Sequence, residues 1–390
     1  MGAGNWKGLP EFGGKIAAIG HGGGSWVSVA VLSTAAIVTT IVICSYSSSL
    51  ASAARLVDKP DFERKLHARE TPLIGGLAMM VPTLAIALIY VLLFPADTYL
   101  SAGIFASSVV LLLGVVDDRM SISAPWRLAA LIYAIFVALS VEPDFILYSL
   151  NLNFLGLSTV IPFHSLAGPL TLLIVVGFIN AANLADGMNG QLLGSVLIWS
   201  AFLMRYSAPA DAAPFFVLFI CAGITLVFNL RGRLFSGSAG AYSSAIFIGL
   251  SAIATYHHSQ GALQATTVAL WFWLPVADCI RVMLHRLKAR KSPFEGDRDH
   301  FHHLLLVQFG QRLALPIYLI LLGLPGLVAI LDPKLGQIAL VGCFAAYWFL
   351  VSTRLQTLTT FTKSFPEKMY SGLSVPLGGS DCGDGTTERG

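Results

Sequence analysis

Long apolar stretches alternate with short polar segments along most of the chain. About eleven of these stretches have the roughly 17–23 residues that a helix needs to cross a hydrocarbon core of about 30 Å. We predict membrane-spanning helices over residues 26–46, 73–94, 98–116, 126–147, 166–182, 191–206, 212–230, 241–256, 265–284, 313–331 and 337–355. The pattern is typical of an all-α integral membrane protein.

Charged residues are scarce in this sequence. Asp, Glu, Lys and Arg make up 12% of the 390 residues, whereas apolar residues make up 55%. Soluble domains carry about 25% charged residues, which help to cover their surface. The composition therefore excludes an ordinary soluble enzyme and a nucleic-acid-binding domain, and it makes membrane lipid the surroundings of most of the chain.

The predicted spans form one transmembrane domain, residues 26–355, between two polar ends. Residues 1–25 are rich in glycine, and we expect a flexible extracytoplasmic N-terminus there. Residues 356–390 end in a polar, glycine-rich sequence, and we expect a cytoplasmic tail that is largely disordered.

Lysine and arginine are distributed unevenly between the two sides of the predicted membrane. Nearly all of the 24 lie in or beside the loops after the first, third, fifth, seventh and ninth helices, or in the tail. The exceptions are Lys7, Lys15, Arg205 and Lys334. Basic residues in short loops mark the cytoplasmic side. We therefore predict that the N-terminus lies outside and the C-terminus in the cytoplasm, an arrangement that requires an odd number of spans.

Two adjacent carboxylates, Asp117 and Asp118, follow the third predicted helix in the sequence GVVDDR. The C-terminal end of a helix carries partial negative charge, so the pair is unfavourable there without a cation. One interpretation is a solvated pair that Arg119 and Arg127 neutralise. The other is a pair that handles a divalent metal ion or phosphate, since Mg²⁺ prefers carboxylate oxygens.

A second polar cluster, NLADGMNG, ends the fifth predicted helix. Asp186 and Asn189 are three residues apart, so a helical turn would place both on one face. Gly187 and Gly190 allow a ligand to approach the backbone closely. The alternative is an ordinary polar turn that is rich in Asn and Gly.

The loop after the ninth predicted helix combines a basic run, residues 285–291, with aspartates and histidines. A basic run beside a membrane commonly reflects topology or a contact with anionic lipid. The residues that are harder to explain in this way are Asp297, Arg298, Asp299, His300, His302 and His303. A transition-metal site is one interpretation, although the HExxH pattern of zinc proteases is absent. Side chains that grip a pyrophosphate fit the surrounding positive charge better.

Basic residues also precede the second predicted helix, at Lys65, His67 and Arg69. A further carboxylate, Asp278, lies within the ninth predicted helix, where a charged group is costly and usually functional. Together the clusters describe a basic basin with carboxylates at the cytoplasmic surface of the bilayer. Such a basin suits a soluble substrate with two phosphates that meets a lipid phosphate.

Seven segments between about Arg55 and Gly310 occur in the order of one known family: LVDKP, TPLIGG, GVVDDR, NLADGMNG, FNL, PVAD and SPFEGDRDHFHHL. In this ordered set the chain resembles the polyprenyl-phosphate N-acetylhexosamine-1-phosphate transferases, above all their bacterial undecaprenyl-phosphate GlcNAc-1-phosphate transferase (WecA-like) branch. The resemblance implies transfer of N-acetylhexosamine-1-phosphate from a UDP-sugar, with UDP-GlcNAc the first choice, to undecaprenyl phosphate with release of UMP. It further implies a Mg²⁺ cofactor (or Mn²⁺), the bacterial inner membrane with the active site facing the cytoplasm, initiation of O-antigen or another surface glycan, and a homodimer.

The resemblance also implies roles for the polar clusters. Asp117 and Asp118 would orient or deprotonate the lipid phosphate, and Asp118 would assist the metal. Asp186, together with Asn183 and Asn189, would serve the nucleotide–metal site. In the histidine loop, the residues that would bind phosphate or sugar are Arg298, His300, His302 and His303. In the basic loop, the residues that would bind the lipid phosphate are Lys65, His67 and Arg69.

Two positions depart from the family's pattern. Ser238 stands in residues 235–240 (FSGSAG) where the family usually has an Asp associated with the metal, and Asn189 replaces a second Asp. A hydroxyl and an amide can bind Mg²⁺, but two negative charges are lost. The alternative is therefore a non-catalytic or divergent paralogue that binds polyprenyl phosphate or nucleotide sugar. A secondary transporter is disfavoured, because its ionisable residues would cluster near the middle of the membrane.

Overall fold

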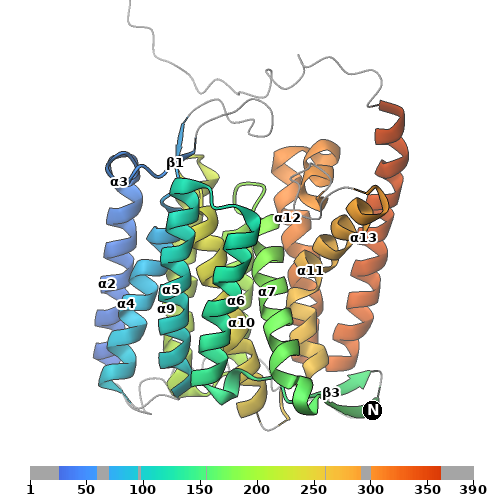
Figure 1. The fold of residues 1–390 in the computed structure, drawn as a ribbon, viewed down its shortest axis with the longest axis horizontal. Coiled ribbons are helices and arrows are strands. Elements are labelled where there is room, and N and C mark those ends of the chain that lie inside the picture. The colour runs from blue at the N-terminus through green and yellow to red at the C-terminus, as the bar shows by residue number, and fades with distance from the viewer. Residues whose placement is uncertain are drawn as a thin grey trace, which may run out of the picture.

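The computed structural model describes residues 26–58, 70–94, 98–154, 156–259, 261–290 and 300–361. These residues form a bundle of long helices with a small antiparallel sheet at each of its two ends (Figure 1). The elements are α2 (Trp26–Ser45), α3 (Ser47–Ala54), β1 (Val57–Asp58), β2 (Thr71–Pro72), α4 (Gly75–Leu93), α5 (Thr98–Met120), α6 (Ala124–Val141), β3 (Ser149–Phe154), β4 (Leu157–Pro162), α7 (Ala167–Leu184), α8 (Gln191–Tyr206), α9 (Ala212–Leu230), α10 (Gly237–His258), α11 (Ala265–Lys288), α12 (Phe301–Leu331) and α13 (Pro333–Phe361).

Every predicted span overlaps a helix of the structure, although the span predicted over residues 126–147 extends beyond the end of α6 at Val141 and the span over 313–331 covers only the later part of α12. Within the described ranges, nine helices are long and apolar enough to cross a membrane. The helix pair α2 and α3, bent by 69°, adds a tenth if it is counted as one span. With 16 residues, α8 is about 24 Å long and falls short of a hydrocarbon core of about 30 Å. The all-α membrane class is confirmed, whereas the count of eleven spans and their orientation stay predictions.

Large apolar side chains cover the outside of the bundle. Leu92, Phe105, Phe136 and Trp348 are all more than half exposed, although they lie in the middle or at the ends of different long helices. Soluble monomers rarely expose contiguous apolar surface on this scale. The surface therefore fits lipid as its solvent.

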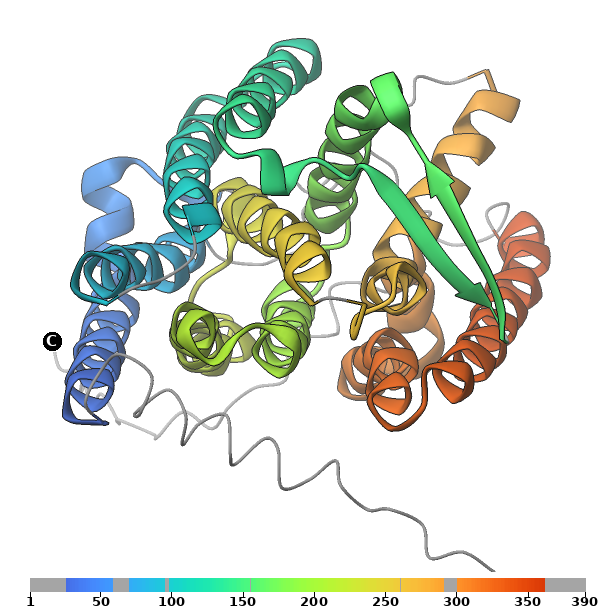
Figure 2. The same ribbon diagram turned by 90° about the horizontal axis from the view of Figure 1, so that it is seen from below.

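The helix α10 runs through the interior of the bundle, and every residue from Ala239 to Tyr256 is buried. It packs against α4, α5, α7 and α8, and Figure 2 shows it in yellow with these helices around it. Glycines permit the close approach at its first turn. A side chain at Gly76 of α4 would collide with the backbone of Gly240, and one at Gly114 of α5 would collide with Ala239. The start of α10 is therefore held tightly against both neighbours.

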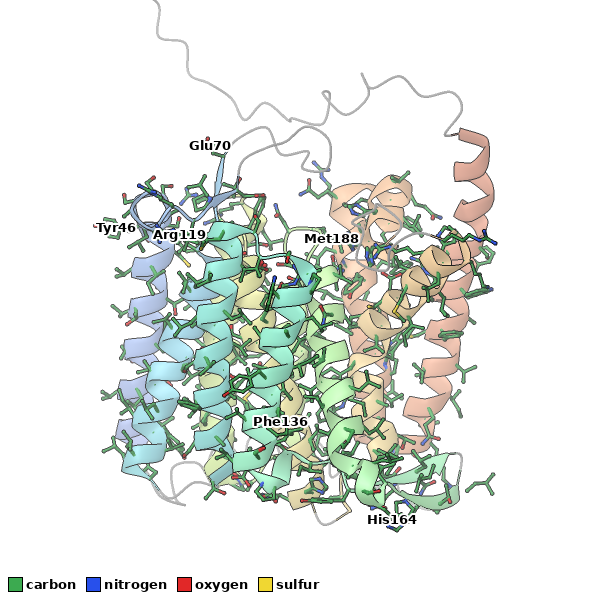
Figure 3. All side chains as sticks on the ribbon, in the orientation of Figure 1. Tyr46, Glu70, Arg119, Phe136, His164 and Met188 are labelled. Carbon is green, nitrogen blue, oxygen red and sulfur yellow. The ribbon has the colours of Figure 1, made fainter. Side chains whose placement is uncertain are left out.

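The polar clusters gather at one end of the bundle, which we call the motif end. It holds the last turn of α5, the loop between α7 and α8, and the first turns of α10 and α12. Figure 3 shows Glu70, Arg119 and Met188 at this end and His164 at the opposite end. We call the opposite end the hairpin end, because the antiparallel pair β3–β4 lies there.

Candidate active site

The carboxylate of Asp118 caps the N-terminus of α10. Its Oδ1 accepts a hydrogen bond from the backbone N–H of Ser238 (2.7 Å), and its Oδ2 accepts one from the N–H of Ala239 (3.0 Å). The backbone lies against the carboxylate at Gly237, the first residue of α10, which has a φ of 67° and no room for a side chain. A helix N-terminus carries partial positive charge and unpaired N–H groups, so it stabilises this anion.

Asp117 has different surroundings from its neighbour. Tyr242 of α10 donates its hydroxyl hydrogen to Oδ2 (2.8 Å), and the backbone N–H of Ile122 donates to Oδ1 (3.0 Å). The guanidinium of Arg127 lies 3.7 Å from Oδ2. Asp117 is buried, so the interpretation of a solvated pair is wrong for this carboxylate, although its ion pair with Arg127 is confirmed.

The segment that contains Ser238 is also bonded to the start of α4. The N–H of Phe235 donates to the carbonyl of Pro72, and the N–H groups of Gly75 and Gly76 donate to the carbonyls of Phe235 and Ser236. The TPLIGG and FSGSAG segments therefore form one backbone unit. This unit holds Ser238, whose hydroxyl is within hydrogen-bonding reach of Asp118.

The loop between α7 and α8 carries Asp186. The sequence predicts that a helical turn places Asp186 and Asn189 on one face. This prediction is wrong, because α7 ends at Leu184 and both residues lie on irregular backbone. Gly190, with a φ of 86°, directly precedes α8, and its N–H donates to Oδ1 of Asn229 (2.6 Å). Because Asn229 also donates to the carbonyl of Leu234, it ties this loop to the segment before α10.

Asp186 is half-buried beside Asp118. Burial of the carboxyl group is the main reason that the pKa of Asp186 is raised to about 7. The charge of Asp118 acts in the same direction, and the backbone N–H of Leu192 acts against it. Asn183, whose carbonyl accepts the N–H of Asp186, and Asn189 are partly buried in the same loop. The structure therefore brings the two acidic motifs together.

Two histidines of the third motif are buried against this loop. His302 is 2% exposed, and a side chain on Gly187 would collide with its Nε2 atom. The rings of His300 and His302 are nearly parallel, with centroids 5.8 Å apart, and the ring of His303 lies 4.1 Å from that of His302. Three of these ring nitrogens have no hydrogen-bond partner among the described residues: Nε2 of His300 and both nitrogens of His302. Buried polar atoms without partners are rare, and a bound water, ion or ligand satisfies them.

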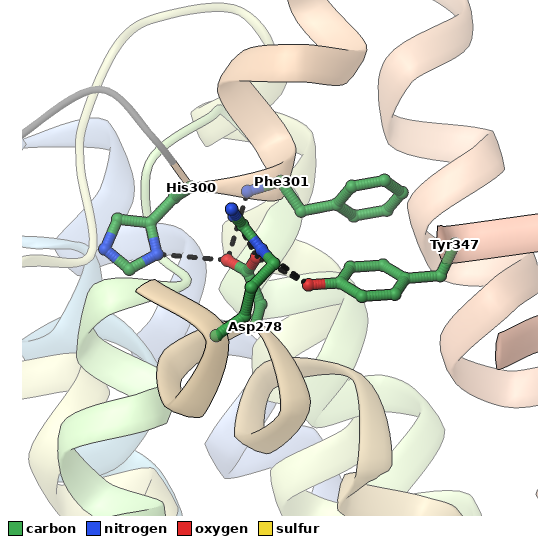
Figure 4. Close-up of polar contacts among 5 residues, drawn as sticks. Asp278, His300, Phe301 and Tyr347 are labelled. Carbon is green, nitrogen blue, oxygen red and sulfur yellow. Dashed lines mark hydrogen bonds and ion pairs between the residues drawn. The ribbon is translucent and has the colours of Figure 1, made fainter. Parts of the chain in front are cut away.

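Asp278 of α11 anchors the histidine segment (Figure 4). Its Oδ2 accepts hydrogen bonds from Nδ1 of His300 and from the backbone N–H of Phe301, each at 3.0 Å. Its Oδ1 contacts Arg281 of the same helix and the hydroxyl of Tyr347 on α13. Sequence reasoning missed Tyr347 and Tyr242, because nothing in the pattern indicates which distant helices pack together. It also missed Arg281 as a partner of Asp278, although the two lie three residues apart on one helix and this spacing could have indicated the pair.

Four predicted site residues lie outside the described ranges. Lys65, His67 and Arg69 belong to residues 59–69, and Arg298 belongs to residues 291–299. Their roles stay predictions.

The described residues hold no group of three His, Cys, Asp or Glu side chains placed for a metal ion. Mg²⁺ commonly binds through one or two carboxylates and takes its other ligands from water and substrate phosphates. Asp118 and Asp186 meet this lower requirement, because they are two carboxylates close enough for their charges to interact. The donor set therefore fits a magnesium ion that is shared with a phosphate substrate.

The fold and this site define a multi-pass helical membrane protein with two converging acidic motifs and buried histidines at one end of its bundle. Residues 100–256, which include both acidic motifs and Ser238, match the model of glycosyl transferase family 4. The chain is 28% identical over 289 residues to the undecaprenyl-phosphate alpha-N-acetylglucosaminyl 1-phosphate transferase of Escherichia coli K12, covering 68% of this chain and 73% of that protein.

Mycobacterial proteins give matches of the same kind. The chain is 28% identical over 291 residues to the decaprenyl-phosphate N-acetylglucosaminephosphotransferase of Mycolicibacterium smegmatis, covering 66% of this chain and 71% of that protein. It is 27% identical over 296 residues to the protein of that name from Mycobacterium leprae. The resemblance inferred from the motifs is confirmed: the chain is similar to polyprenyl-phosphate N-acetylglucosamine-1-phosphate transferases from two groups of bacteria.

Proposed function

We propose that the chain transfers N-acetylhexosamine-1-phosphate from a UDP-sugar, with UDP-GlcNAc the first choice, to undecaprenyl phosphate. An oxygen of the lipid phosphate attacks the β-phosphorus of the nucleotide sugar, and the bond from that phosphorus to the UMP oxygen breaks. The products are undecaprenyl-diphospho-sugar and UMP. The observation that carries the proposal is the convergence of Asp118, Asp186 and His302 from three separate motifs at the motif end.

The carboxylates of Asp118 and Asp186 would hold Mg²⁺ together with the diphosphate of the substrate. Bound there, the ion would neutralise negative charge on the phosphoryl group that is transferred. A lipid phosphate has a second pKa of about 6, so it is largely ionised near neutral pH and needs little help from a general base. Asp117, already bonded to Tyr242 and Ile122, is better suited to orienting its surroundings than to accepting a proton.

We propose that the motif end faces the cytoplasm of a bacterial inner membrane. Arg119, Arg231 and Arg233 lie in or beside loops at the motif end, whereas Lys334 lies next to Gly156 at the hairpin end. This asymmetry supports the orientation, since basic residues in short loops remain on the cytoplasmic side. The product would initiate a surface glycan such as an O-antigen.

The transfer reaction can be tested with the full chain purified in detergent. Labelled UDP-GlcNAc, undecaprenyl phosphate and Mg²⁺ should yield a lipid-linked product, which should disappear in Asp118→Asn and Asp186→Asn. A panel of UDP-N-acetylhexosamines, read by mass spectrometry of the lipid fraction, would identify the sugar. Absence of product with every sugar, in both the wild-type chain and Ser238→Asp, would contradict the proposal.

A second candidate function is binding of polyprenyl phosphate or nucleotide sugar without turnover. The observation that favours it is Ser238, which places a hydroxyl beside Asp118 where the family has a carboxylate. Saturable binding of UDP-GlcNAc without any lipid product would support this second function.

A further inference from the structure

The carboxylate of Asp278 is fully occupied by partners inside the protein. Oδ1 accepts hydrogen bonds from Nε and Nη2 of Arg281 (3.2 and 2.7 Å) and from the hydroxyl of Tyr347 (3.1 Å). Oδ2 accepts hydrogen bonds from His300 and Phe301. A carboxylate offers about four acceptor positions, and five donors surround this one. Asp278 is 6% exposed and has no capacity left for a metal ion or a substrate.

The bond from His300 to Asp278 determines which ring nitrogen is available. Because Nδ1 donates to the carboxylate, the imidazole is held in one orientation, and Nε2 is the ring nitrogen that remains available to a ligand. Figure 4 shows the His300 ring extending away from Asp278, with the second nitrogen on its far side. The ring is 5% exposed, so this orientation is enforced by packing as well as by the hydrogen bond.

Asp278 also fixes where the histidine helix begins. The N–H of Phe301, the first residue of α12, donates to Oδ2 of Asp278. The rings of Phe301 and Tyr347 pack together with their centroids 4.8 Å apart. Because His302 follows by one residue, the same anchor sets the position of the ring that contacts Gly187. One carboxylate therefore controls both buried histidines.

We propose that Asp278 is a positioning residue that acts through His300, presenting Nε2 of that ring to the substrate bound at the Asp118–Asp186 site. The inference rests on the proposed function, and it deepens that function by giving the buried intramembrane carboxylate a role. Nε2 of His300 and both nitrogens of His302 are buried and lack partners among the described residues. An oxygen of the nucleotide diphosphate only accepts hydrogen bonds, so it pairs with Nε2 of His300 in the imidazolium form, whose other N–H donates to Asp278, and with one N–H of His302.

The chain contains a matched control pair. At the hairpin end, where α10 ends, Nε2 of His258 lies 2.7 Å from Oδ2 of Asp144. Asp278→Asn and Asp144→Asn make the same chemical change to an Asp–His pair, one beside the site and one across the membrane. The full chain in detergent is assayed for KM for UDP-GlcNAc, for kcat, and for melting temperature.

We expect Asp278→Asn to reduce kcat/KM on the order of tenfold to a hundredfold, the range for losing one hydrogen bond to a charged group. Asp144→Asn should leave kcat/KM unchanged. His300→Ala should cost a similar factor, and adding Asp278→Asn to His300→Ala should cost little more, because both changes remove the same interaction. Losses that multiply in the double variant, or equal losses in Asp278→Asn and Asp144→Asn, overturn the inference.

His300→Asn keeps the inference testable if Asp278→Asn fails to fold. An Asn side chain can still donate to Asp278, but it carries no group at the position of Nε2. This variant should melt like the wild type and lose affinity for UDP-GlcNAc as His300→Ala does. If a folded His300→Asn variant binds UDP-GlcNAc with wild-type affinity, the inference is overturned and the proposed function still stands. A wild-type chain that neither binds UDP-GlcNAc nor forms product overturns the proposed function and the inference together.

Discussion

The Nε2 atom of His302 lies against Gly187, at the position that any side chain on residue 187 would occupy. This contact joins the first turn of α12 to the loop that carries Asp186. Gly187 does not have a positive φ, so its backbone conformation does not require glycine. The contact with His302 is what requires a residue without a side chain. The histidine motif and the acidic motif are therefore complementary surfaces of one site.

Replacing Gly187 by Ala should disrupt the site. The added methyl group would displace His302, at a cost of about 1–3 kcal/mol for overpacking a filled position. We expect a clear loss of affinity for UDP-GlcNAc in a binding titration. Gly177→Ala is the control, because a side chain at Gly177 of α7 meets no atom within 4 Å. Equal affinities in the two variants would show that the contact has no role.

The ionisation of Asp186 should govern the pH dependence of activity. Its pKa is raised to about 7, so the carboxylate needed for a metal ion forms only as the pH rises through that value. A bound cation favours the ionised form, and more Mg²⁺ should therefore move the acid limb of the pH–rate profile to lower pH. An acid limb that stays at one pH over a hundredfold range of Mg²⁺ would contradict this role.

The same carboxyl group should also affect stability. Its pKa is higher in the folded chain than the ordinary value of 3.8, so it favours folding most below about pH 3.8 and loses this contribution as the pH rises through 7. Without Mg²⁺, Asp186→Asn should melt at a higher temperature than the wild type at pH 8, and the difference should shrink toward pH 5. Thermal melts at the two pH values provide the measurement.

Tyr242→Phe should destabilise the protein through Asp117. The change removes the hydroxyl that donates to a buried carboxylate, and hydrogen bonds to charged groups contribute about 1.5–3 kcal/mol. A lower midpoint in chemical unfolding should reveal it. Tyr133→Phe is the matched control, since Tyr133 is 70% exposed on the outside of α6. Comparable losses in both variants would mean that the Asp117 contact is not the cause.

Ser238→Asp should strengthen magnesium binding. A third carboxylate beside Asp118 attracts a divalent cation and, when no cation is bound, repels the other two carboxylates. We expect the affinity for Mg²⁺ to rise about tenfold. The variant should melt lower than the wild type without Mg²⁺ and show a larger rise in melting temperature when Mg²⁺ is added. Equal magnesium-dependent shifts in both proteins would place the ion elsewhere.

The helices were predictable from the sequence because each apolar stretch is long and bounded by polar residues. The approximate position of the site was also predictable, since Asp117, Asp118 and the histidines interrupt a charge-poor sequence. The conformation of the Asp186 loop was not, because Gly187 and Gly190 permit several backbone paths and contacts with distant residues, such as Asn229 and His302, accompany the one that is adopted. A three-residue spacing alone therefore gave the wrong local structure.

The partners of the acidic residues were not predictable from local pattern. Tyr242 lies one turn after Ser238 in a buried helix and has no local signal that it meets Asp117 on α5. Asp278 was recognisable as costly within a span, but its partners His300 and Tyr347 come from later helices. Periodicity indicates which face of a helix is apolar, and it does not indicate which helices become neighbours.

The central position of α10 has a consequence for how the protein is made. Among the nine candidate spans of the described residues, α10 has the lowest mean hydropathy and the largest buried share. A segment of this kind partitions weakly into lipid by itself, whereas α4 and α5 are more apolar and emerge from the ribosome earlier. The helix that presents its N-terminus to Asp118 therefore depends on previously inserted helices for its own entry into the membrane.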